Sequence, residues 1–85
     1  MKISVRLYGH FRKFGDRLAL ELPADSRIWD LEQAFVHAIT VRDPSFYENA
    51  ALRASRFCND QAILPRDHPL AGDAELSILP PVSGG

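Results

Sequence analysis

The sequence ends with Gly84 and Gly85, and a chain end this slim could carry its terminal carboxylate, as an acyl donor, into another protein's active site. Glycine has no Cβ and accepts backbone conformations that other residues avoid, so a Gly-Gly end fits a narrow channel. Two prolines begin the segment 80–85 and favour extended chain. Extended, this segment reaches about 20 Å. A carboxylate is a poor electrophile at neutral pH, so we expect Gly85 to donate its acyl group only after activation.

Other residues that could carry chemistry form no recognisable motif. His10, His37 and His68 are too scattered along the chain for the spacing of a metal site. Cys58 has no histidine partner in a nucleophile motif and suits a small apolar position. The sequence has no glycine-rich phosphate loop of the nucleotide-binding types. We therefore expect no metal and no cofactor bound by this chain.

Length and charge narrow the class of protein further. The 85 residues predict one domain, with room for a modest core but not for a deep internal active site as well. Ten basic and eleven acidic residues give a net charge of -1, and no block of like charge indicates binding to nucleic acid or to a membrane. No eighteen-residue apolar run and no secretory signal stand in the sequence, so we expect a soluble, cytoplasmic protein.

The first half of the chain predicts two strands and a helix. Residues 3–8 alternate between apolar and polar side chains, as a half-buried strand does, and residues 17–22 repeat the pattern. We expect the two strands to pair antiparallel. Ser26 is a suitable N-cap for a helix over about 27–40. Its apolar stripe is expected to cover the apolar face of the strands. The stripe consists of Ile28, Leu31, Phe35 and Ile39.

The second half predicts shorter elements. Asp43-Pro44 favours a short second helix over 44–51. The turn-prone residues 59–61 indicate a hairpin between strands at 56–58 and 62–64. An irregular loop over 65–73 then leads to a last strand at about 74–79, which the paired prolines end.

This order of elements predicts an α+β fold of the β-grasp, or ubiquitin-like, type. We expect a mixed sheet of about five strands, with the first and last strands as central neighbours, one main helix and a short second helix. The predicted domain covers 1–79, and 80–85 forms an extended C-terminal tail.

Three segments resemble one known family. They are the ending Leu79-Pro80-Pro81-Val82-Ser83-Gly84-Gly85, the loop over 67–73 and the turn Asn59-Asp60-Gln61. The chain resembles the small subunit of molybdopterin synthase (MoaD), within the MoaD/ThiS group of ubiquitin-like sulfur carriers. The resemblance covers nearly the whole chain, and the last seven residues are its most specific part.

The resemblance implies a carrier that works with several partners. A ubiquitin-activating-like adenylyltransferase uses ATP to adenylate Gly85, and a sulfur donor protein then converts the adenylate to a thiocarboxylate. The large subunit of molybdopterin synthase, in a heterotetramer with the carrier, directs this sulfur to cyclic pyranopterin monophosphate. The catalytic side chains are then expected in the large subunit, while this chain supplies the reactive Gly85 and its neighbour Gly84.

The resemblance also implies a docking surface beside the tail. The expected partner-binding residues are Tyr8, Ile63, Leu79, Pro80, Pro81, Val82 and Ser83. Phe11 and Phe14 are further candidates, next to the basic residues Arg12 and Lys13.

Other functions share the same ending. A sulfur carrier for thiazole formation or for tRNA thiolation would use the same Gly85 chemistry. A ubiquitin-like modifier would instead join Gly85 to lysines of target proteins through an isopeptide bond. A plain interaction domain with an inert tail is a further alternative.

Overall fold

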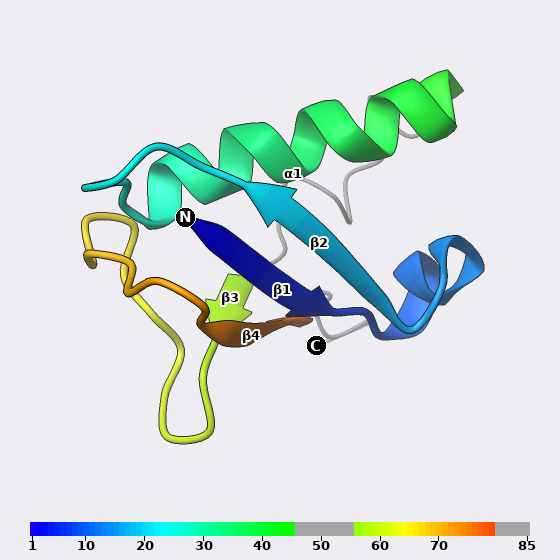
Figure 1. Cartoon of the computed structure of the whole chain (residues 1–85). Coiled ribbons are helices and arrows are strands. Elements are labelled where there is room, and N and C mark those ends of the chain that lie inside the picture. Colours follow the sequence, from blue (N-terminus) through cyan, green and yellow to red (C-terminus); the bar gives the residue numbers. More distant parts are fainter. Residues whose placement is uncertain (46–55, 80–85) are drawn as a thin grey trace.

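The computed structural model describes residues 1–45 and 56–79, and within them a four-stranded sheet packs against one long helix (Figure 1). The sheet order is β2-β1-β4-β3. In chain order the elements are β1 (Lys2–Arg6), the 3-10 helix η1 (Gly9–Phe14), β2 (Arg17–Glu21), α1 (Ile28–Arg42), β3 (Arg56–Cys58) and β4 (Glu75–Leu79).

The two central strands are the first and the last. β1 pairs antiparallel with β2, where Val5 lies opposite Leu18, and parallel with β4, where Val5 lies opposite Leu76. All three side chains are buried, because alternate residues of a strand point to the same face. The alternation in the sequence therefore predicted the strands correctly, and the central neighbours are as expected of a β-grasp fold.

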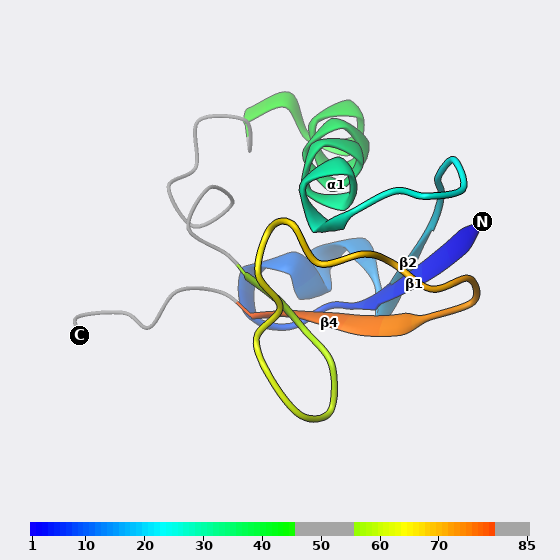
Figure 2. The ribbon, with the colours of Figure 1, turned by 90° about the vertical axis from the view of Figure 1, so that its left-hand side faces the viewer.

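Helix α1 covers one face of the sheet, and no other helix of residues 1–45 and 56–79 covers the opposite face, which we call the open face (Figure 2). Its predicted stripe is confirmed, since Ile28, Leu31, Phe35 and Ile39 are at most 1% exposed. The helix runs two residues further than the predicted end, to Arg42, whose Nη1 donates to the Ala38 carbonyl at 2.9 Å. Burying this stripe on the sheet hides apolar surface that neither layer could hide alone.

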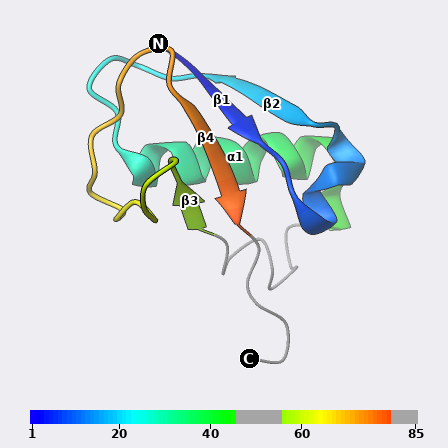
Figure 3. The same cartoon turned by 90° about the horizontal axis from the view of Figure 1, so that it is seen from below.

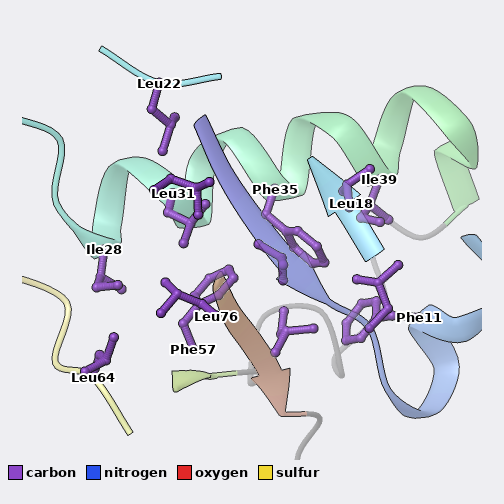
Figure 4. Close-up of a cluster of buried hydrophobic side chains, with 14 residues drawn as sticks. Phe11, Leu18, Leu22, Ile28, Leu31, Phe35, Ile39, Phe57, Leu64 and Leu76 are labelled. Carbon is purple, nitrogen blue, oxygen red and sulfur yellow. The ribbon is translucent and has the colours of Figure 1, made fainter. Parts of the chain in front are cut away.

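Three phenylalanines form the middle of the core (Figure 4). The Phe35 ring of α1 meets Phe11 edge-on at 5.4 Å between centroids and Phe57 of β3 at 5.6 Å. Edge-to-face pairs at this spacing are favourable beyond the area they bury. The core thus ties η1, α1 and β3 together.

The expectation that Phe11 belongs to a docking surface is wrong. The connection between β1 and β2 is not a simple polar loop but the helix η1, which turns Phe11 inward until it is fully buried. Gly9 is the first residue of η1 and Gly15 follows its last residue, with φ of 59° and 117°. Such positive φ values suit glycine, so the two glycines allow the chain to enter and leave this turn.

The predicted N-cap is also corrected. The Ser26 hydroxyl donates to the Pro23 carbonyl at 2.7 Å and so closes the preceding turn. Arg27 is the N-cap residue, with an extended backbone, and its N–H donates to the Asp30 carboxylate at 2.8 Å. An acidic side chain in the first helical turn is also favoured by the helix dipole.

The sheet of the described residues has four strands, not the predicted five. Residues 62–64 do fold back on β3, but Ile63 makes only an isolated bridge with Cys58. The turn is held by the Asn59 side chain, whose Oδ1 accepts the N–H groups of Gln61 and Ala62 at 2.8 and 2.9 Å. Of the predicted second helix, residues 46–51 lie outside the described residues.

Candidate functional site

The predicted site residues at the end of the sequence follow directly after β4. The described part of this strand ends at Leu79, and the predicted tail residues lie outside the described residues. These are Pro80, Pro81, Val82, Ser83, Gly84 and Gly85. The surroundings of Leu79 therefore indicate which surface lies beside the tail.

Leu79 and Tyr8 lie at the same level of the sheet. Arg6 pairs with Ser77 in the parallel ladder between β1 and β4, and Tyr8 and Leu79 each come two residues later. Side chains two residues apart on extended chain share a face, so all four lie on the face that points away from α1. Figure 3 shows β1 and β4 side by side in the sheet, seen from below. Tyr8 is 37% exposed and Leu79 is 38% exposed. Two apolar side chains thus flank the start of the tail.

Ile63 is a further exposed apolar residue on the same face, beyond β3. It bridges to Cys58, which itself pairs with Ser77 of β4. Bridge partners point to the same side of a sheet, so Ile63 belongs to the open face as well. It is 59% exposed. We call Tyr8, Ile63 and Leu79 the tail-exit patch, and all three predicted docking residues of the described chain are therefore accessible.

Charged residues border the tail-exit patch on the side of β2. Glu75 of β4 receives two guanidinium groups, from Arg6 at 3.7 Å and from Arg17 at 3.4 Å. Hydrogen bonding to Tyr8, together with the charges of Tyr8 and Glu75, raises the pKa of Arg6. No sequence pattern predicts this arrangement, because it depends on the register of three strands.

A groove lies where this charged surface meets η1. Its volume is about 580 Å³. It is lined by Arg6, Leu7, Tyr8, Arg12, Asp16 and Arg17. Arg12 Nη2 lies 3.0 Å from Asp16 Oδ1. Tyr8 lines this groove and also belongs to the tail-exit patch, so the two surfaces are continuous.

Phe14 and Lys13 of η1 make contacts on the side of the molecule where α1 lies. Phe14 is half-buried and packs against the core. The Lys13 ammonium lies 5.3 Å from its ring centroid and 2.5 Å from the Asp43 carboxylate at the end of α1. These contacts give both residues a role in joining η1 to α1.

Cys58 and the possible metal ligands were the other candidates for chemistry in the sequence. Burial, and secondarily the charge of Asp60, raises the pKa of the Cys58 thiol. Within 1–45 and 56–79, no group of three or more histidine, cysteine, aspartate or glutamate residues could hold a metal ion. No helix in the same ranges is long and apolar enough to cross a membrane.

Solved structures share this architecture over nearly the whole chain. SAMP1 from Haloferax volcanii superposes with a TM-score of 0.73 at 19% identity, and the match covers 100% of both chains. The UBL domain of Plasmodium falciparum Dsk2 gives 0.61 at 16% identity, covering 95% of this chain and 97% of that domain. The chain has the ubiquitin-like β-grasp fold.

A third neighbour comes from Pyrococcus furiosus. This protein, assigned as molybdopterin converting factor subunit 1, gives a TM-score of 0.68 at 24% identity, with 95% of this chain and 98% of that chain covered. No protein-family model and no curated protein sequence matches the chain. At these identities the likeness establishes the ubiquitin-like fold, and the chemistry has to be argued from the residues.

Proposed function

We propose that this ubiquitin-like protein is a sulfur carrier whose C-terminal Gly85 is adenylated and then converted to a thiocarboxylate. The observation that carries the proposal is the position of the tail-exit patch. Tyr8, Ile63 and Leu79 are exposed apolar residues on the open face, beside the strand that leads into the Gly-Gly tail. Large apolar side chains exposed together are typical of a docking surface.

The chemistry starts at the terminal carboxylate. One Gly85 carboxylate oxygen attacks the α-phosphorus of ATP, and pyrophosphate leaves with the electrons of the broken bond. The terminal sulfur of a donor persulfide then attacks the carbonyl carbon, and AMP leaves. A thiol reductant finally attacks the donor sulfur of the remaining S–S bond, forms a new disulfide with that sulfur, and displaces the acyl sulfur, which stays on Gly85 as the thiocarboxylate.

In this scheme the chain binds its partners and presents the Gly85 carboxylate to them, and the partners catalyse the reactions. Activation requires groups that bind ATP and stabilise negative charge, and an 85-residue domain filled by one core has little room for them. The tail-exit patch would hold the partner while the tail enters its active site. Prolines at the start of the tail lower the entropy lost on insertion.

The acceptor we favour is cyclic pyranopterin monophosphate, with the large subunit of molybdopterin synthase as the docking partner in a heterotetramer. The full ending of the sequence supports this choice, together with the fold shared with the Pyrococcus furiosus protein. In this role the chain is the small subunit of the synthase and works in the cytoplasm. The carrier would take part in molybdenum cofactor biosynthesis.

A discharge experiment tests the acceptor. The chain can be prepared with a C-terminal thiocarboxylate by sulfide cleavage of an intein fusion, which bypasses the activating enzyme. Mixed with the large subunit and the pterin precursor, it should return to the carboxylate form as dithiolene product accumulates. A thiocarboxylate that persists beside active large subunit would point to thiazole formation or tRNA thiolation instead. Isopeptide conjugates formed by the unmodified chain with ATP and activating enzyme would identify a protein modifier.

A further inference from the structure

The groove beside the tail-exit patch has a surplus of positive charge. Three of its lining residues are arginines, from β1, η1 and β2, and we call it the arginine groove. Their guanidinium groups share two carboxylates. The Glu75 carboxylate forms ion pairs with both Arg6 and Arg17, and the Asp16 carboxylate pairs with Arg12.

The arginines are left with unused binding capacity. Each guanidinium carries five N–H donors in a planar fork that matches a carboxylate. The two ion pairs of Glu75 are long, at 3.7 and 3.4 Å, so neither arginine makes a close two-point contact with it. Arg6, Arg12 and Arg17 are each between 46% and 61% exposed. A carboxylate brought into the groove would therefore meet accessible donors.

We propose that the arginine groove binds carboxylate side chains of an acidic segment on the partner protein that docks at the tail-exit patch. The partner is the one required by the proposed function, and this inference adds the chemistry of its contact surface. That surface should carry an apolar residue against Tyr8 and acidic residues a few ångströms further on, toward Arg12 and Arg17.

A protein segment suits the groove better than a free small anion. Exposed ion pairs in water contribute little, because the charges are already solvated and screened. A docked protein excludes water from the groove, and the same pairs become stronger at the lower local dielectric constant. Tyr8 belongs both to the arginine groove and to the tail-exit patch. A free phosphate in the groove would leave the apolar side chains of the tail-exit patch exposed to water, whereas a protein segment could cover both surfaces.

The surplus charge also affects how fast the partner is captured. Complementary charges raise association rates and make them depend on salt concentration. The net charge of the whole chain is only -1, so the steering would come from this local surface. An acidic partner would then arrive with the groove and the tail exit already facing it.

Binding of a model peptide tests the inference without any activating enzyme. The probe is a capped peptide that alternates glutamate with leucine, titrated into the isotope-labelled full chain while the arginine Nε–Hε and backbone signals are followed by NMR. A peptide with glutamine in place of glutamate, inorganic phosphate and ATP are run beside it. We expect saturable shifts at Arg6, Arg12, Arg17 and Tyr8 with the acidic peptide and much smaller ones with its glutamine counterpart.

Two variants make the result specific. The double variant Arg12→Gln with Arg17→Gln should weaken acidic-peptide binding by about threefold to tenfold. The control Arg42→Gln, on the helix side, should bind as the native chain does. Equal weakening by both variants, no binding at all, or tighter binding of phosphate than of the peptide at these residues would overturn the inference. Because sulfur loading is measured separately, failure here leaves the carrier proposal standing.

Discussion

Arg6 of β1 lies opposite Ser77 of β4 in the parallel centre of the sheet. This register brings the C-terminal ends of both strands to the same end of the sheet, and Tyr8 and Leu79 each follow this pair by two residues. The polypeptide leaves the sheet at that point toward the Gly-Gly end. A single alignment of two strands thus places Tyr8 and the arginine groove near the end of β4, the strand that precedes the Gly-Gly segment in the sequence.

Polar substitution in the tail-exit patch should weaken docking and leave the fold intact. For Tyr8→Ser with Leu79→Ser, we expect the KM for the chain in the adenylation reaction to rise about tenfold or more, since buried interface anchors contribute about 2 kcal/mol or more each. The reaction's kcat should change little, because neither side chain reaches the reacting carboxylate. Steady-state kinetics with the activating enzyme measure both values.

Val41→Ser provides the matched control. Val41 is an apolar residue that is 67% exposed, but it lies on α1 rather than on the open face. Its substitution should leave KM unchanged. An equal rise of KM for both proteins would show that general surface polarity, and not the tail-exit patch, governs the reaction.

The core prediction concerns Phe35, which joins the rings of Phe11 and Phe57. Phe35→Ala should lower the free energy of unfolding by about 3–5 kcal/mol, because it removes buried contacts and leaves a cavity. Trp29→Ala, at a side chain that is 49% exposed, should cost far less. Denaturant unfolding of the two variants should separate them clearly, and similar losses would contradict this description of the core.

Asp43 should contribute to the acid sensitivity of the fold. Hydrogen bonds from Lys13 and Ser45 lower the pKa of its carboxyl group. A carboxyl with a lower pKa in the folded state adds stability above its unfolded pKa, and this stability is lost as the pH falls through the folded value. Lowering the pH should therefore reduce the free energy of unfolding more in the native protein than in the Asp43→Asn variant. NMR titration should also show the Asp43 pKa rising toward its ordinary value in Lys13→Ala, and an unchanged pKa would exclude this contact as the cause.

The Cys58 thiol should react slowly with alkylating reagents in the folded protein. Burial and the nearby Asp60 carboxylate raise its pKa, so little thiolate is present at pH 8. Alkylation by iodoacetamide should be slower in the native protein than in urea, and Asp60→Asn should speed it modestly. If native Cys58 reacted as fast as the unfolded chain, the proposed protection would not exist.

Much of the fold could be predicted from local patterns. The alternation in β1 and the helical spacing of Leu31, Phe35 and Ile39 each report which side faces the core, and the structure follows them. The burial of Phe11 could not be predicted in this way. A buried aromatic side chain inside a short 3-10 turn leaves no periodic signal. The two flanking glycines, Gly9 and Gly15, were the available hint of a sharp turn.

The site was only partly predictable. Tyr8, Ile63 and Leu79 could be named from the family resemblance, and the structure confirms that they are accessible. The grouping of Arg6 and Arg17 around Glu75 could not, because these residues are far apart in sequence and meet only through strand register. Sequence periodicity assigns a residue to a face but does not say which residue of the next strand it will meet.

The central claim is best tested by the intact mass of the chain after activation. The full chain is incubated with ATP, a persulfide donor, a thiol reductant and the ubiquitin-activating-like adenylyltransferase of its own genome, and a chain lacking Gly85 is treated in parallel. The account predicts a mass gain equal to replacement of one oxygen by sulfur, confined to the C-terminal peptide. The truncated chain should show no gain and nearly the same thermal midpoint. An unchanged mass with an enzyme proven active, or sulfur bound elsewhere than Gly85, would contradict the account.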